Sequence, residues 1–116
     1  MEKYDLYING KWEKPSSGSY FDSDNPYTGE IWAQIARGNE QDVDFAVKVA
    51  RNAFEDHWEP MKPTERGKIL VRLAELIERE APRLGIIEVK DNGKLFAEMG
   101  AQTKYLAEWY RYFGGL

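Results

Sequence analysis

The first third of the chain alternates short apolar segments with turn-forming residues, a pattern typical of strands. Two such segments, 5–8 and 11–13, flank Asn9-Gly10. Both residues of this pair tolerate a positive φ, which a type I′ turn requires, so the segment predicts a β-hairpin. Residues 19–24 and 31–36 also favour an extended conformation. We therefore expect a hairpin and further strands before the first helix.

The remaining two thirds carry apolar residues three or four positions apart, the spacing of an amphipathic helix. Asn39 can cap the first helix, and Pro63 fits the first position of the second, where its missing amide hydrogen has no cost. The apolar positions of the first helix are Val43, Ala46, Val47, Ala50 and Phe54, and the second helix is expected to bury Ile69, Leu70, Leu73, Leu76 and Ile77.

Two further helices are expected after residue 81. Pro82 is expected to begin one, which ends at Asn92-Gly93 because glycine supplies a left-handed cap. The last, over about 95–113, is apolar on two faces and is expected to have neighbours on two sides. One face holds Phe96, Met99, Thr103, Leu106, Tyr110 and Phe113, and the other holds Ala101, Tyr105, Trp109 and Tyr112. The sequence thus predicts an α/β chain, with strands over about 5–36 and about four helices over about 40–113.

Composition narrows the function classes. The 116 residues suffice for one domain, and 42% hydrophobic with 31% charged residues is ordinary for a soluble protein. A formal net charge of −4 argues against a nucleic-acid binder, which would carry a basic face. No apolar run reaches the ~18 residues of a membrane span, and the first residues do not resemble a signal peptide. We expect a cytoplasmic protein that binds neither nucleic acid nor membrane.

Candidate chemistry within the chain is sparse. There is no cysteine, which excludes disulfides, thiolate metal sites and a cysteine nucleophile among these residues. There is also no glycine-rich phosphate loop. The single histidine, His57, is expected in a loop and cannot form a metal site or a triad alone. Asp91-Asn92-Gly93-Lys94 is interpreted as a helix end, in which Lys94 favours the negative pole of the helix. No residue of this chain is therefore assigned a catalytic role.

A series of short motifs nevertheless resembles a known family. In order, they are Tyr7-Ile8-Asn9-Gly10-Lys11-Trp12, Asn25-Pro26-Tyr27-Thr28-Gly29-Glu30, Asp42-Val43-Asp44 with Ala46-Val47, Glu65-Arg66 and Asp91-Asn92-Gly93-Lys94. Each motif is short and weakly specific, but their joint order resembles the amino-terminal segment of the NAD(P)-dependent aldehyde dehydrogenase superfamily. The resemblance covers nearly all of the chain, which corresponds to roughly the first quarter of a typical member.

The resemblance implies a function for a longer parent enzyme. Family members oxidise an aldehyde to a carboxylic acid, with NAD or NADP accepting the hydride from an adduct of the aldehyde with a cysteine thiolate. Residues 1–116 would be the amino-terminal part of the NAD(P)-binding domain, and the catalytic domain would be absent from this chain. The nucleophile, the glutamate base and the dinucleotide loop would all lie beyond these residues. The parent would be a homodimer or a homotetramer, and this chain alone would be inactive and would not bind the cofactor.

The resemblance also implies two sites. Some family members hold a monovalent cation through main-chain carbonyls, which here would belong to Ser23, Asp24 and Asp91; a hard cation prefers such oxygen ligands. The last helix would border the tunnel through which aldehyde substrate enters, with Ala101, Tyr105 and Trp109 in contact with substrate. Packing within the core is the alternative role for these three residues.

Two alternative functions stay open at this point. The chain could be a small, non-catalytic interaction module that binds a partner through its last helix and its open strand edges. It could also be a truncated product without a function. Aromatic residues on both faces of the last helix favour a piece of a larger protein, since a self-contained module would expose a polar face.

Overall fold

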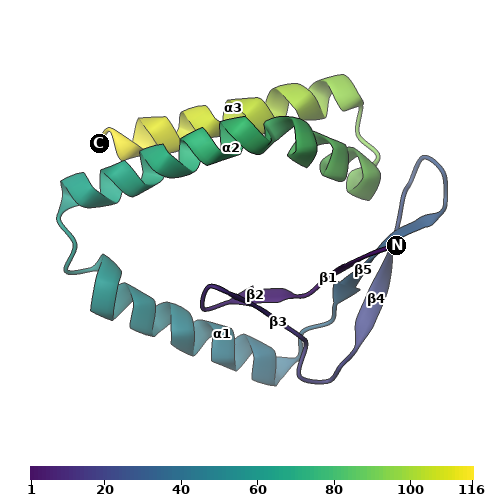
Figure 1. Cartoon of the computed structure of the whole chain (residues 1–116), viewed down its shortest axis with the longest axis horizontal. Helices are drawn as coiled ribbons and strands as arrows, with labels where there is room; N and C mark the ends of the chain where they lie inside the picture. The colour runs from purple at the N-terminus through teal and green to yellow at the C-terminus, as the bar shows by residue number, and fades with distance from the viewer. The chain divides into compact units, whose positions relative to one another are not determined.

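The computed structural model describes residues 1–116, which form two compact units, Met1–Pro60 and Met61–Leu116 (Figure 1). The first unit contains every strand, the first helix and a short π-helical turn. The second unit is a pair of long helices. The mixture of strands and helices confirms the predicted α/β class.

A three-stranded sheet and a two-stranded hairpin form the first part of the first unit. The strands are β1 (Glu2–Tyr4), β2 (Leu6–Ile8), β3 (Lys11–Glu13), β4 (Tyr20–Asp24) and β5 (Ile31–Ala36). In the larger sheet β5 is central, with β1 parallel on one side and β4 antiparallel on the other. Ala33 and Ala36 of β5 are buried in this unit, as is Pro15 in the loop before β4.

The predicted hairpin is confirmed. Strands β2 and β3 pair in the antiparallel sense, with Ile8 opposite Lys11. Asn9 and Gly10 have φ of 56° and 74°, as a type I′ turn requires. The Tyr7 and Trp12 rings stack edge to face with centroids 5.0 Å apart. Strand β1 was not predicted, because its three residues are mostly polar and its partner lies about thirty positions away in the sequence.

Helix α1 (Glu40–Ala53) begins with the cap that the sequence predicts. The Asn39 side chain accepts from the Asp42 amide at 3.0 Å, and the Asp42 carboxylate accepts from the Asn39 amide at 3.0 Å. The Ser16 amide also donates to Asp42, at 3.0 Å, which ties the preceding loop to the helix start. These hydrogen bonds, led by the Asn39 amide, lower the pKa of the Asp42 carboxyl.

Most of the apolar positions of α1 are exposed in this structure. Val43, Val47 and Phe54 are exposed, Ala50 is exposed too, and only Ala46 of the predicted set is half-buried. Phe54 belongs to a π-helical turn, η1 (Phe54–Trp58), rather than to α1 itself. The periodicity correctly predicted a helix here.

Helix α2 (Pro63–Asn92) is continuous over 30 residues, so the expectation of a new helix at Pro82 is wrong. The chain has three α-helices instead of about four. Proline in a helix interior removes one hydrogen bond, here the one to the Glu78 carbonyl, and breaks many helices. In α2 the residues on either side, Ala81 and Gly85, are buried, so packing holds both halves in one helix. The ends are as predicted, with Pro63 at the first turn and Gly93 at φ 71°.

Helix α3 (Phe96–Gly114) packs along α2 through small residues. Gly67 of α2 lies against the backbone of Gly114, and Gly85 lies against the backbone of Gly100. Ala74 and Ala107 are fully buried. Because these residues have little or no side chain, the helix backbones approach closely, and this contact is the core of the second unit.

The outer faces of both helices are consequently more exposed than predicted. In α2, Ile69 and Leu73 are exposed, whereas Leu70, Leu76 and Ile77 are half-buried. In α3, Met99 is buried and Thr103 and Tyr110 are half-buried, whereas Phe96, Leu106 and Phe113 are exposed. Small residues, and not the large apolar stripes, make the contact between the helices. None of the helices combines the length and the apolar character needed to cross a membrane.

Candidate functional site

The residues predicted to touch substrate lie together on one exposed face of α3. Ala101, Tyr105 and Trp109 line a shallow hollow with Gln102 and Leu106. The Tyr105 and Trp109 rings meet edge to face, with centroids 6.2 Å apart and an interplanar angle of 87°. Tyr105 is 61% and Trp109 55% exposed, so neither ring is part of the core of this unit. Large apolar surfaces of this kind usually mark a contact with another molecule or another part of a protein.

A second hollow continues the same face toward the carboxyl end of α3. It is lined by Tyr105, Glu108, Trp109 and Tyr112. The Tyr112 ring also stacks edge to face on Phe113, with centroids 5.1 Å apart. We call Ala101, Tyr105, Trp109 and Tyr112 together the aromatic face of α3. It combines the four residues that the sequence places on one side of the last helix.

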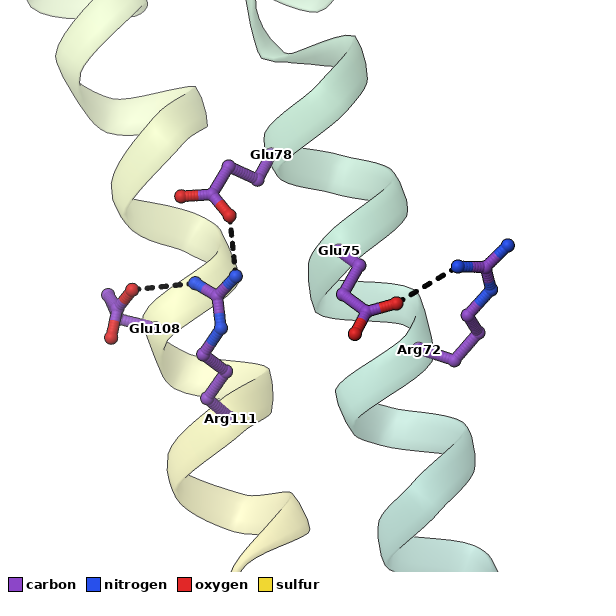
Figure 2. Close-up of polar contacts among 5 residues, drawn as sticks. All are labelled: Arg72, Glu75, Glu78, Glu108 and Arg111. Atoms are coloured by element: carbon purple, nitrogen blue, oxygen red, sulfur yellow. Dashed lines mark hydrogen bonds and ion pairs between the residues drawn. The ribbon is translucent and has the colours of Figure 1, made fainter.

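The direction of the aromatic face is set by the contact between α2 and α3. Figure 2 shows Arg111 of α3 between Glu78 of α2 and Glu108 of its own helix, with N–O distances of 2.5 Å and 2.7 Å. The hydrogen bond that Arg111 donates to Glu78 is the main cause of a raised pKa of Arg111, so the guanidinium stays charged. The Thr103 hydroxyl donates to the Met99 carbonyl at 2.7 Å and also lies 3.3 Å from the Ala81 carbonyl of α2. These contacts and the close glycine packing fix the rotation of α3 about its axis.

The chemistry available on the aromatic face is binding and not catalysis. The side chains that line its hollows are aromatic or apolar, apart from the Gln102 amide and the Glu108 carboxylate, which is paired with Arg111. Aromatic rings with this geometry bury apolar groups of a ligand or a neighbouring segment. The aromatic face therefore fits a wall of a binding site better than a set of acid and base groups.

The carbonyls predicted to hold a cation come from three places in the chain. Ser23 and Asp24 end β4 at an irregularity in its pairing with β5, and the Trp32 indole donates to the Ser23 hydroxyl at 3.2 Å. Asp91 is in the last turn of α2, ahead of the left-handed Gly93. Ser23 and Asp24 belong to the first unit and Asp91 to the second, and the cation site stays a prediction. No three His, Cys, Asp or Glu side chains gather where they could hold a metal ion.

His57 lies in the π-helical turn η1 and not in an irregular loop. It lines a small hollow with Asp56, Asn52, Val49 and Ala53 and with Asn9 of the hairpin turn. No second histidine or cysteine accompanies it, so its surroundings do not form a metal site or a nucleophile–base pair.

A further apolar hollow, on α2, was not predicted. Its floor is Met61, Ile69, Leu73 and Leu76, and its rim is Glu65, Lys68 and Arg72. Sequence reasoning assigned Ile69, Leu73 and Leu76 to the core and so overlooked this surface. A signal was available, because Gly67, Ala74 and Ala81 recur every seven residues in α2, as do Gly100, Ala107 and Gly114 in α3. Two such series favour close packing of the helices through the faces that hold small residues. The faces that hold large apolar residues then lie outside this contact.

Residues 1–116 contain no glycine-rich strand–turn–helix of the dinucleotide-binding type. A dinucleotide site of that type needs a strand, a glycine-rich turn and a helix in succession, with parallel strands joined through that helix. Here the parallel strands β1 and β5 are connected through β2, β3 and β4, without a helix between them. No glycine-rich phosphate loop occurs in the sequence. We therefore assign no cofactor contact to residues 1–116.

Comparison with known proteins gives the family. Residues 12–116 match the aldehyde dehydrogenase family. The chain is 45% identical over its whole length to a (Z)-2-((N-methylformamido)methylene)-5-hydroxybutyrolactone dehydrogenase of Acinetobacter baylyi. Its structure matches an NAD-dependent aldehyde dehydrogenase of Sinorhizobium meliloti with a TM-score of 0.93 and 30% identity over 97% of the chain. It matches an NAD+ complex of a Bacillus cereus aldehyde dehydrogenase with a TM-score of 0.92 and 35% identity over 97% of the chain. The chain belongs to the aldehyde dehydrogenase family.

The matched proteins are much longer than this chain. The 116 residues span 24% of the Acinetobacter dehydrogenase and 23% of each of the two solved structures. The comparisons therefore confirm the predicted family. The chain spans about a quarter of the length of each of these relatives.

Proposed function

We propose that residues 1–116 are the amino-terminal part of an NAD(P)-dependent aldehyde dehydrogenase that oxidises an aldehyde to a carboxylic acid. The supporting observation is the family match over residues 12–116 by a chain that spans 23–24% of its matched relatives. NAD in the descriptions of two solved relatives supports a nicotinamide cofactor for the parent enzyme. The choice between NAD and NADP belongs to residues outside this segment.

Apart from the aromatic face of α3, the role of this segment in the parent enzyme is structural. It contains no cysteine to attack the aldehyde and forms no glycine-rich strand–turn–helix for the dinucleotide. The 116 residues alone are therefore inactive, and the catalytic domain is supplied by the rest of the parent. The segment belongs to the NAD(P)-binding domain of a cytoplasmic homodimer or homotetramer. Its monovalent-cation ligands are the carbonyls of Ser23, Asp24 and Asp91, as the family resemblance implies.

An activity assay tests the proposal. The protein purified from its source cells is mixed with a panel of aldehydes and with NAD or NADP, and reduced cofactor is followed by absorbance. Aldehyde-dependent reduction is expected, together with the matching carboxylic acid as product. The 116-residue chain, expressed separately, is expected to give no reduction under the same conditions. Activity in the short chain, or none in the purified protein with any aldehyde of the panel, would refute the proposal.

The aromatic face of α3 is the part of this segment that meets the aldehyde. In the parent enzyme, Trp109→Ala is expected to change the ratio of kcat/KM between a bulky aromatic aldehyde and acetaldehyde by about tenfold, because one aromatic contact is worth about 1 kcal/mol or more. Tyr27→Ala is the matched control, since Tyr27 is 91% exposed in a turn far along the sequence from α3. An equal ratio in the Trp109 variant and the parent would place the aromatic face away from the substrate.

A further inference from the structure

The chain contains two Asn-Gly pairs, Asn9-Gly10 and Asn92-Gly93, which the structure holds in different ways. An asparagine followed by glycine is open to attack on its side-chain amide by the next backbone nitrogen, because glycine has no side chain to obstruct ring closure. From the contacts of the two pairs, we propose that Asn9 is a site of spontaneous deamidation and that Asn92 is protected from it.

The reaction is a ring closure followed by hydrolysis. The Gly10 amide gives up its proton to a base, and its nitrogen bonds to Cγ of Asn9. The Cγ–Nδ2 bond breaks, and the nitrogen leaves as ammonia, carrying a proton from solvent. Water then opens the five-membered imide at either carbonyl, which gives aspartate or isoaspartate. The balance is one water consumed and one ammonia released, with no oxidation or reduction.

The hairpin turn leaves Asn9 open to this reaction. Asn9 and Gly10 are both exposed, and no atom lies within 4 Å of the position of a Cβ on Gly10. Beyond the strand pairing, neither the Gly10 amide nor the Asn9 side chain is hydrogen-bonded. The nucleophile, the leaving group and the approach of water are therefore unobstructed.

At the end of α2, hydrogen bonds restrain both the amide that would attack and the side-chain amide of Asn92. The Gly93 amide, which would be the nucleophile, donates to the Val89 carbonyl at 3.0 Å. The Asn92 Nδ2, which would leave, donates to the Glu88 carboxylate at 2.7 Å. The Asn92 Oδ1 accepts from the Lys94 amide at 2.9 Å. Ring closure at Asn92 requires these hydrogen bonds to break, so its deamidation is slowed by about tenfold or more relative to Asn9.

Deamidation at Asn9 changes the hairpin. Aspartate adds one negative charge to a turn that has none in its two central residues. Isoaspartate adds one carbon to the main chain, which is incompatible with a two-residue loop between Ile8 and Lys11. The turn of the hairpin therefore changes with the age of the protein.

Peptide mapping of the protein purified from its source cells tests this proposal. The folded protein is incubated in warm, mildly alkaline buffer, and cleavage after glutamate then gives peptides 3–13 and 89–98, one for each Asn-Gly pair. Conversion is read as a mass increase of about 1 Da that separates into two isomers. Peptide 3–13 is expected to convert about tenfold faster than peptide 89–98. Equal rates in the folded protein, or faster conversion of 89–98, would overturn the proposal.

Two controls separate the effect of structure from that of sequence. In concentrated urea both peptides are expected to convert at similar rates, because both pairs are then Asn-Gly in an unfolded chain. Glu88→Ala frees the Asn92 leaving group and also removes the cleavage site before residue 89, so Asn92 is then read in peptide 81–98. Conversion of that peptide in the folded protein is expected to be several-fold faster than conversion of 89–98 in the unmodified protein, with 3–13 unchanged. An unchanged rate in this variant would show that the hydrogen bond to Glu88 does not slow deamidation at Asn92. Asn9→Gly keeps a turn that accepts positive φ and must abolish the conversion of peptide 3–13.

Discussion

The close approach of Gly67 in α2 to Gly114 in α3 gives a sharp test of how the second unit is held together. A Cβ added to Gly67 would lie 2.4 Å from the carbonyl oxygen of Gly114. Carbon and oxygen atoms that touch without bonding are about 3.3 Å apart, so the helices must separate locally by nearly 1 Å. The opposing atom is backbone and cannot rotate away. Gly67→Ala is therefore expected to weaken the packing of α3 on α2.

Two opposing terms set the size of the effect. Alanine in a helix interior is about 1 kcal/mol more favourable than glycine, which on its own would stabilise α2. Forcing extra volume into a close-packed contact costs about 1–3 kcal/mol, and a backbone clash falls at the upper end of that range. The free energy of unfolding of the second unit is thus expected to fall by about 1–2 kcal/mol in Gly67→Ala.

Gly100→Ala is the matched control, because a Cβ at Gly100 would meet no atom within 4 Å. Only the helix-propensity term applies there, and stability should rise by about 0.5–1 kcal/mol. Urea unfolding of residues 1–116, followed by far-ultraviolet circular dichroism, measures both changes. Opposite signs for the two variants are expected. A Gly67→Ala variant as stable as the unmodified chain would refute the close packing of these backbones.

Two further predictions concern the proline in α2 and the tyrosine of β4. Pro82→Ala restores a helical amide and should raise the free energy of unfolding by about 1–3 kcal/mol, measured by the same urea titration. A loss of stability in this variant would mean that the proline ring itself packs favourably. Tyr20 donates to the Asp5 carboxylate at 2.5 Å, and this hydrogen bond, with burial and the Asp5 charge, raises the pKa of Tyr20 from 10.0 to about 12. Because the folded-state pKa is the higher one, this stabilisation is complete below pH 10 and is lost as the pH rises toward 12. The free energy of unfolding is measured from pH 10 to 12 for the unmodified chain and two variants. Tyr20→Phe should not lose stability over this range, whereas Tyr27→Phe should lose it as the unmodified chain does. Identical pH profiles for all three proteins would contradict a stabilising hydrogen bond between Tyr20 and Asp5.

Local signals in the sequence predicted the ends of elements well. Asn9-Gly10, the Asn39 cap and Gly93 each act through backbone dihedral angles or hydrogen bonds within a few residues, so their effect can be read without the rest of the fold. Pro82 was the exception. Its local cost is offset by packing of Ala81 and Gly85 against a helix that comes later in the chain.

The covered faces of the helices were harder to predict, since burial depends on which surfaces meet. The large residues Ile69 and Leu73 were expected inside, but the small series containing Ala74 makes the contact with α3. A hydrophobic stripe indicates that one face of a helix packs against another element, but it does not identify that element. The aromatic face of α3 was predicted as a group because helical spacing alone gathers Tyr105 and Trp109. The carbonyls proposed for the cation come from separate elements, and no local rule links them.

The intact mass of the protein made by its source cells, detected through peptides of residues 1–116, tests the central proposal most directly. The chain has a mass of 13.5 kDa and spans 22–24% of matched aldehyde dehydrogenases, so a parent between four and five times that mass is expected. A mass of 13.5 kDa would contradict the proposal that these residues are part of a complete aldehyde dehydrogenase chain. The exposed aromatic face of α3 would then be best explained as the binding surface of a small interaction module.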